Sequence, residues 1–255
     1  MSTATLTSTA QTHAVVSPEQ WLDARVALLA KEKELRKQMD DVARLRRELP
    51  WERIEKNYVF ETNEGRKQLA ELFDGRSQLM LYHFMFGPDW EQGCAGCSFV
   101  ADHIDGAAVH LAHRDVTLTA VSRAPLEKIN AFKNRMGWKF RWVSAFGSDF
   151  NFDYHVSFTE GEMARGEVYY NYAVRRFPQS EGPGISVFYK NDAGQVFHTY
   201  SAYARGLDVL IGTYNYLDLA PKGRDEGGFE MPMAWLRHHD RYEDSPKVSS
   251  CGCEE

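Results

Sequence analysis

Apolar runs of strand length alternate with segments of helical periodicity from residue 78 onward. Residues 78–86 (QLMLYHFMF) form a near-continuous apolar run, which is typical of a strand that is covered on both faces. After Cys97, apolar residues recur at helical spacing through residue 113. The two patterns then repeat and predict a strand, a helix that begins with proline, and a shorter strand over residues 116–122, 125–137 and 140–145.

The pattern closes with a hairpin and a helix. Residues 185–190 and 195–200 flank the turn sequence NDAG (191–194), and a helix that Pro221 ends fits residues 207–219. The order is therefore β-α-β-α-β, an insertion, and then β-β-α. It predicts an α/β protein with a thioredoxin-like central mixed sheet that is flanked by helices.

A long N-terminal helix is predicted as an addition to this domain. Ser17 is placed as an N-cap, Pro18 at the first helical position and Gln20 as the capping-box partner, and Pro50 ends the helix. Its apolar residues recur in steps of three and four, at Leu22, Val26, Leu29, Leu35, Met39, Val42 and Leu45. We expect this stripe to pack on the domain or on a second copy of the chain, and a homodimer is the predicted assembly.

Four parts are expected along the chain. They are a disordered tail, the helical extension, the thioredoxin-like domain and a C-terminal extension, over residues 1–17, 18–50, 51–222 and 223–255. Within the third part, residues 51–75 are mixed in character, with a short helical piece predicted at 65–73.

Composition narrows the class of protein. Hydrophobic residues make up 43% of the chain, which is enough for a packed core, and the net charge of −6 gives no basic face for nucleic acid. The longest apolar run is too short to span a bilayer. The first 17 residues lack a basic start and an apolar core, so they do not resemble a secretory signal. The sequence predicts a cytoplasmic protein without nucleic-acid or membrane partners.

The four cysteines occur as two close pairs, Cys94/Cys97 and Cys251/Cys253. In a reducing compartment such pairs indicate redox chemistry or metal binding rather than structural disulfides. The first pair is predicted at a strand-to-helix junction, where free amides and the helix dipole stabilise a thiolate. Cys94 is therefore the candidate attacking thiolate and Cys97, one turn later, the candidate resolving thiol. No cofactor is expected.

The segments GCAGCSF (93–99) and RHHDRY (237–242) give the chain from about Trp51 onward a resemblance to a bacterial thioredoxin-like family of unknown function. The resemblance implies a thioredoxin-like fold and thiol–disulfide chemistry, with protein or small-molecule thiols or disulfides as partners. Typical thioredoxins have tryptophan before the first cysteine and proline inside the pair, where this chain has Gly93 and Ala95-Gly96. Pro183 is the nearest candidate for the proline that faces the pair.

Peroxiredoxins share this plan, and the segment FNFDYHV (150–156) is similar to one of theirs. Their peroxidatic motif has threonine or serine three residues before the cysteine, where this chain has Glu91. A peroxidase is thus one alternative to the oxidoreductase. A non-catalytic binding or scaffold protein with a relict cysteine pair is another.

The second cysteine pair lies in the tail sequence SSCGCEE. It is a candidate auxiliary dithiol that exchanges with Cys94 and Cys97, or a ligand for a soft metal ion. All four cysteines together are a candidate zinc site, although the C-x-C spacing is tight.

Other residues are candidates for the surroundings of the first pair. Trp90 and Pro183 are pocket candidates, whereas Phe86 and Trp138 are assigned to the aromatic core. Among the histidines, His83 is predicted to lie in the core, His103 to be exposed, and His238 and His239 to lie in a surface loop with Asp240 and Tyr242. A polar and aromatic cluster in the insertion is expected to cover part of the site, and its members are Asp149, Asn151, Asp153 and Tyr154.

Overall fold

The computed structural model describes residues 13–242 of the 255-residue chain. Its helices and strands follow in the order α1 (Pro18–Arg47), β1 (Glu52–Arg53), β2 (Val59–Thr62), β3 (Gly65–Gln68), η1 (Leu69–Glu71), β4 (Gln78–His83), α2 (Ala95–Ala101), α3 (Ile104–Ala112), β5 (Val116–Ser122), α4 (Leu126–Arg135), β6 (Arg141–Ser144), α5 (Phe150–Asp153), α6 (Glu160–Arg165), β7 (Val168–Tyr170), β8 (Ala173–Arg175), β9 (Gly184–Lys190), β10 (Val196–Tyr203), η2 (Ala204–Leu210), α7 (Gly212–Leu217) and η3 (His239–Arg241).

The chain divides into two units, residues 1–49 and 50–255, and each is described by itself. In the first unit, α1 begins with the predicted capping box: the Ser17 hydroxyl accepts the Gln20 amide at 3.3 Å, and the Gln20 side chain accepts the Ser17 amide at 3.1 Å. None of the residues of α1 is buried.

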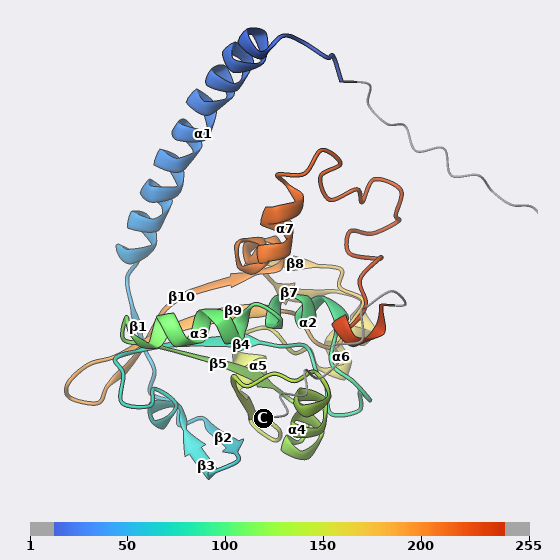
Figure 1. Ribbon diagram of the computed structural model, residues 1–255. Coiled ribbons are helices and arrows are strands. Elements are labelled where there is room, and N and C mark those ends of the chain that lie inside the picture. Colours follow the sequence, from blue (N-terminus) through green and yellow to red (C-terminus); the bar gives the residue numbers. More distant parts are fainter. Residues whose placement is uncertain (1–12, 243–255) are drawn as a thin grey trace, which may run out of the picture. The chain divides into compact units, whose positions relative to one another are not determined.

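The second unit is built on an eight-stranded sheet in the order β1-β10-β9-β4-β5-β6-β2-β3 (Figure 1). Strands β4, β5 and β6 are parallel, while β9 pairs with the other side of β4 in antiparallel direction and β10 pairs antiparallel with β9. This arrangement is the predicted thioredoxin-like mixed sheet with its closing hairpin. Strand β4, which leads to the first cysteine pair, lies in the middle of it.

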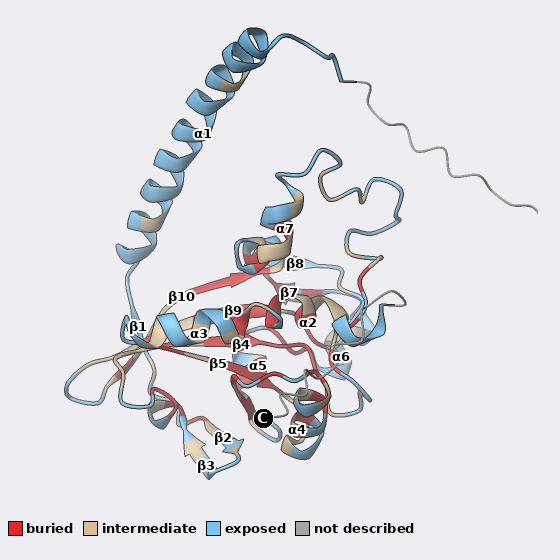
Figure 2. Cartoon of the chain, viewed as in Figure 1, coloured by how far each residue is buried: buried red, intermediate tan, exposed pale blue. Residues whose placement is uncertain are grey.

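One face of the sheet carries the crossover helices. Since β4, β5 and β6 follow one another in the same direction across the sheet, two crossovers of the usual hand place their helices on the same face. Side chains from α2, α3, α4, η2 and α7 pack there against one core cluster, which includes Tyr82 and Cys97. The other face is covered by η1, α5 and β7, around a second cluster that includes Phe150 and Tyr154. Burial is accordingly concentrated along the central strands (Figure 2).

Most predicted elements agree with the structure, and the strand at 116–122 agrees at both ends. The helical piece predicted at 65–73 is wrong. Residues Gly65–Gln68 pair with β2 as a hairpin, because the turn before them ends at Gly65, whose φ of +102° suits glycine. Only Leu69–Glu71 form a helical turn, of the 3₁₀ type.

Two predicted helices are each divided. The helix predicted to run to residue 113 is broken between α2 and α3 at Asp102 and His103, where Asp102 accepts a hydrogen bond from the indole of Trp138 at 2.8 Å. The helix predicted at 207–219 is the 3₁₀ segment η2 followed by α7. No helix in residues 13–242 has both the length and the apolar composition that a membrane span requires.

Candidate functional site

The loop of residues 84–93 carries the chain from β4 to the first cysteine. Backbone hydrogen bonds near its start and at its end hold this loop against the end of the sheet. The carbonyl of Phe86 accepts the amide of Ala124 at 2.8 Å, and the amide of Cys94 donates to the carbonyl of Met85 at 3.0 Å. The loop therefore presents Cys94 beside the carboxyl ends of β4 and β5.

Gly93 is the tightest position in this loop. A Cβ atom there would lie 2.6 Å from the ring of Phe84 and 2.8 Å from the ring of Phe132. Both rings are buried in the core, so neither has room to move away. The residue directly before Cys94 has to be glycine for this packing to form.

Cys94 and Cys97 occupy the positions that the sequence predicts. Cys94 is the N-cap of α2 and is half-buried, whereas Cys97 is buried one turn into the helix. Both are free thiols. The sulfur of Cys97 accepts the backbone amide of Met85 at 3.3 Å, and the carbonyl of Cys94 accepts both the amide and the hydroxyl of Ser98 at 2.9 Å.

The two thiols differ in acidity. A hydrogen bond from the Cys97 thiol, together with the amides of Cys97 and Gly96, lowers the pKa of Cys94 although burial acts against it. Burial and the neighbouring Cys94 raise the pKa of Cys97 well above its usual value. The half-buried Cys94 is therefore the more acidic thiol, and the buried Cys97 is the one that keeps its proton.

Tyr82 adds a buried hydroxyl to this site. Its side chain is 1% exposed, and its oxygen has no hydrogen-bond partner among the described residues other than the neighbouring Cys97 thiol. Burial, and after it the neighbouring Cys97, raise the pKa of Tyr82 well above its usual value. The sequence pattern does not distinguish Tyr82, because Tyr82 is one of several large side chains in an apolar strand.

The C-terminal residues 226–242, which we term the cover segment, pack onto the same site. Glu226 anchors the segment to α7: its carboxylate accepts the hydroxyl of Tyr214 at 2.7 Å, the indole of Trp235 at 2.7 Å and the amide of Met233 at 3.0 Å. The sulfur of Met233 lies 3.8 Å from where a Cβ of Gly96 would be, between the two cysteines. The segment therefore reaches the cysteine pair itself.

The predicted surface position is wrong for His238, which is buried, whereas His239, Asp240 and Tyr242 are exposed as predicted. Both histidine side chains contact the cysteine loop or its helix. His238 is 6% exposed and bonds through Nε2 to the carbonyl of Gly93 at 2.9 Å. His239 bonds through Nδ1 to the carboxylate of Asp102, at the end of α2, at 2.6 Å. In Figure 1 the end of the described chain lies beside α2.

Arg135, from α4, fixes the other side of His238. It donates to Nδ1 of His238 at 2.9 Å, holds both carboxylate oxygens of Asp240 at 2.8 and 2.9 Å, and reaches Gln92 in the loop at 3.2 Å. Its hydrogen bond lowers the pKa of Asp240 to about 2. The cover segment is thus held by a charged pair as well as by packing.

The two pocket candidates, Trp90 and Pro183, lie in different loops. Trp90 is half-buried and packs against Gly87, where a Cβ would lie 3.0 Å from its indole. Pro183 precedes β9, and its carbonyl accepts the hydroxyl of Tyr170 at 2.6 Å. Phe86 and Trp138 are buried in the aromatic core, as predicted.

Of the remaining histidines, His83 is a core residue as predicted. It stacks on Phe150 and bonds to Ser186 at 2.8 Å through Nε2, while Nδ1 has no partner among the described residues, and burial lowers its pKa to about 3. His103 is not exposed as expected. It is half-buried and accepts the amide of Thr213 at 3.3 Å, which ties the break between α2 and α3 to α7.

The cluster of Asp149, Asn151, Asp153 and Tyr154 does not cover the cysteine pair as expected, since α5 packs on the opposite face of the sheet. Asp149 and Asp153 bind Lys56 at 2.9 and 2.6 Å instead.

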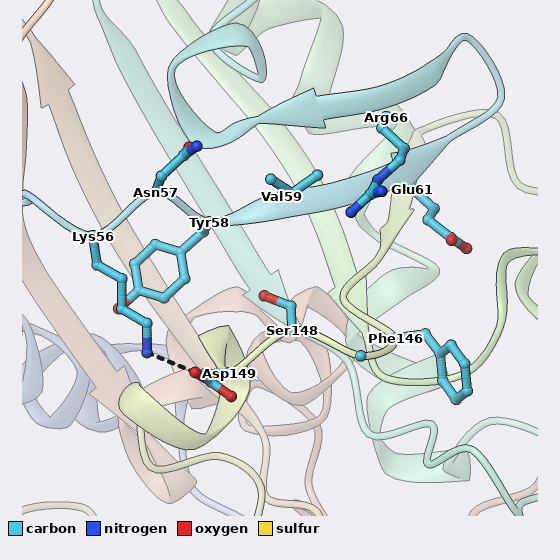
Figure 3. Close-up of a pocket in the computed structure, with 10 residues that line it drawn as sticks. Lys56, Asn57, Tyr58, Val59, Glu61, Arg66, Phe146, Ser148 and Asp149 are labelled. Atoms are coloured by element: carbon cyan, nitrogen blue, oxygen red, sulfur yellow. Dashed lines mark hydrogen bonds and ion pairs between the residues drawn. The ribbon is translucent and has the colours of Figure 1, made fainter.

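A pocket of about 230 Å³ opens beside this cluster, between β2 and the loop after β6 (Figure 3). Lys56 and Arg66 line it together with Glu61 and Asp149. Its two cations and two carboxylates favour neither an anionic nor a cationic ligand.

Cys251 and Cys253 lie outside the described residues, and the predicted auxiliary dithiol and four-thiolate zinc site lie there with them. Within residues 13–242, no group of three or more histidine, cysteine or acidic side chains is placed to hold a metal ion.

The chain is a thioredoxin-like protein: its cysteine pair lies in the first turn of a helix, after the loop that follows the central strand of a mixed sheet. It belongs to the family described as "Bacterial protein of unknown function (DUF899)", whose model matches residues 10–242. A comparison with curated proteins finds no significant match.

Several solved structures resemble the chain. The peroxidoxin BcpB from Mycobacterium tuberculosis is 12% identical, with a TM-score of 0.39, over 65% of this chain and 95% of that one. Peroxiredoxin Q from Xanthomonas campestris is 11% identical, with a TM-score of 0.43, over 65% of this chain and 95% of that one. We assign the fold from the strand order, independently of these likenesses.

Proposed function

We propose that this protein is a thiol–disulfide oxidoreductase in which Cys94 attacks and Cys97 resolves. The observation that carries the proposal is the hydrogen-bonded thiol pair at the start of α2, in which the half-buried sulfur is the more acidic one. A low pKa increases the thiolate fraction at neutral pH, and the thiolate is the nucleophile in disulfide exchange.

The reaction runs in two exchanges. The Cys94 thiolate attacks one sulfur of a substrate disulfide, forms a mixed disulfide and releases the first substrate thiolate, which takes up a proton. Cys97 then gives up its proton and attacks the Cys94 sulfur, so that the second substrate thiol leaves. Two electrons pass from the cysteine pair to the substrate, and an external dithiol restores the reduced pair. The same steps in reverse oxidise a dithiol, and the reduction potential decides the direction.

The substrates that fit this site are thiols and disulfides, with small molecules favoured over folded proteins. Met233 of the cover segment lies over Gly96, inside the pair, and Cys94 is only partly exposed. A short disulfide needs to reach one sulfur, whereas a disulfide on a folded surface requires a wider opening. Cys251 and Cys253 remain a proposed auxiliary dithiol.

A redox titration in a dithiothreitol gradient tests the proposal, with the oxidation state of Cys94 and Cys97 read from peptide masses. We expect a reversible two-electron couple, and a Cys97→Ser variant should accumulate a mixed disulfide on Cys94. A Cys94→Ser variant is the matched control and should trap nothing. Absence of a reversible couple would favour a scaffold protein, and rapid oxidation of Cys94 by hydrogen peroxide to a sulfenic acid would favour a peroxidase.

A further inference from the structure

The peptide unit between Gly93 and Cys94 is held from both sides. On one side the Cys94 amide donates to the carbonyl of Met85 at 3.0 Å, and on the other the Gly93 carbonyl is bonded to Nε2 of His238 at 2.9 Å. A peptide unit is planar, so two hydrogen bonds at its opposite edges fix its orientation. The Cα atom of Cys94 belongs to this plane.

The chemistry of its neighbours fixes the protonation of His238. Arginine only donates hydrogen bonds, so Nδ1 of His238, which faces Arg135 at 2.9 Å, must be the unprotonated nitrogen. A carbonyl only accepts, so Nε2 carries the proton and donates it to Gly93. The neutral imidazole therefore acts as a rigid link from an arginine to the loop.

This link is itself supported. Arg135 is held by both oxygens of Asp240, and the edge of the His238 ring contacts Phe132, the same ring that leaves no room for a side chain at Gly93. The chain of contacts from Asp240 through Arg135 and His238 to Gly93 thus ends on the residue next to Cys94.

We infer that His238 is a positioning residue for Cys94: by holding the Gly93 carbonyl it keeps the backbone of Cys94, and with it the sulfur, in place beside Cys97 at the start of α2. This inference rests on the proposed function, since it gives His238 a role in the reactivity of the same thiol. Without the link, the peptide unit keeps only the hydrogen bond to Met85 and the packing at Gly93, and the Cys94 sulfur is held less firmly beside the Cys97 thiol that stabilises its thiolate.

Two substitutions of His238 separate the effect of its hydrogen bonds from the effect of its size. His238→Leu removes the donor and the acceptor, whereas His238→Gln offers an amide N–H to Gly93 and a carbonyl to Arg135. His239→Leu is the matched control, because it removes the neighbouring imidazole of the same segment, which bonds to Asp102 at the end of α2.

The measurement is the rate of alkylation of Cys94 by iodoacetamide between pH 5 and 9, followed on the Cys94 peptide in the full chain. We expect His238→Leu to shift the midpoint to higher pH and to lower the rate at pH 7 roughly three- to tenfold, the range that the loss of one hydrogen bond gives. The limiting rate at high pH should stay unchanged. His238→Gln and His239→Leu should keep the wild-type profile.

A His238→Leu profile equal to the wild type would overturn the inference, as would equal shifts in the His238→Leu and His239→Leu variants. Should His238→Leu not fold, His238→Asn replaces it, because its amide is too short to reach both partners. If wild-type Cys94 itself titrates like a free cysteine, the proposed function fails first and the inference fails with it. A low wild-type midpoint that persists in His238→Leu removes the inference alone.

Discussion

The backbone amide of Met85 donates a hydrogen bond to the sulfur of Cys97 at 3.3 Å, so the chain that leaves β4 contacts the second cysteine directly. The same residue accepts the amide of Cys94 through its carbonyl. Met85 thereby holds both members of the pair against the end of the central strand. Cys97 is buried in the core, and Cys94 is half-buried.

Removal of the Cys97 thiol should make Cys94 less acidic. The Cys97 hydrogen bond is the largest cause of the lowered pKa of Cys94, so a Cys97→Ala variant should bring that pKa back toward the free value of about 8.5. A thiol whose pKa rises is less ionised at neutral pH, and alkylation of Cys94 at pH 7 should slow several-fold. A variant with Cys251→Ser and Cys253→Ser is the control, and the proposal of a paired site would be contradicted if it slowed equally.

Tyr82→Phe should slow the second exchange without affecting the first. Its buried hydroxyl has no partner among the described residues other than the Cys97 thiol, whose pKa it lowers, so it is placed to donate to a developing Cys97 thiolate. A chromogenic aromatic disulfide reports both steps, since the first thiolate is released by Cys94 and the second by Cys97. We expect the second release to slow roughly three- to tenfold.

The stability of the Tyr82→Phe variant provides its control. Loss of a buried hydroxyl whose one neighbour is a weak sulfur acceptor should change the free energy of unfolding by no more than about 1 kcal/mol. A slower first release, or equal rates for both releases in the variant and the wild type, would show that Tyr82 takes no part in resolution.

Because of Glu181, the free energy of unfolding should decrease as the pH rises from about 4.5 to 7. Its carboxyl is 2% exposed, and burial raises its pKa to about 7 although Ser157 and Arg123 bond to it at 2.5 and 3.0 Å. In this window the native state binds a proton that the unfolded state has lost, so deprotonation at higher pH favours unfolding. The effect is on the order of 3 kcal/mol at full size.

A Glu181→Gln variant, which cannot titrate, isolates this contribution. Urea unfolding at pH 5 and pH 7.5 should show a larger loss of stability for the wild type than for the variant. Parallel changes in the two proteins would assign the pH dependence to other groups.

Self-association through α1 is the fourth prediction. Leu28, Leu35 and Val42 recur at seven-residue spacing and are 54%, 57% and 44% exposed, which favours a helix that pairs with a second copy. We expect a dimer by sedimentation at micromolar concentration and a monomer for Leu35→Glu combined with Val42→Glu. Lys37 lies on the side of the helix opposite Leu35, so Lys37→Glu should leave the dimer intact. A wild-type monomer would refute the prediction.

Local sequence patterns predicted the central strands and the cysteine pair because each depends on neighbours in the chain. The run 78–86 indicates a buried strand, and the cysteines follow it at the start of a helical pattern. The hairpin of β2 and β3 was missed, since its short strands bury only Phe60 and show little apolar alternation. Its turn glycine was the one available signal.

The surroundings of the pair were less predictable because they come from distant residues. His238 and His239 are adjacent, yet one is buried against Gly93 and the other binds Asp102, and nothing in the local pattern distinguishes them. Tyr82 differs from its apolar neighbours only by the hydroxyl. Both residues gain their place from tertiary contacts, which single-sequence periodicity does not report.

The bond between His238 and Gly93 joins residues 145 positions apart. At about 5–20 residues per second, the ribosome completes the cysteine loop roughly 7–30 s before the histidine that holds it. The nascent chain therefore carries its redox pair without a cover while the remainder of the sheet is still being synthesised. Any oxidant or chaperone that reaches the emerging chain meets the pair in this interval, and closure of the cover is a late step in the biogenesis of the protein.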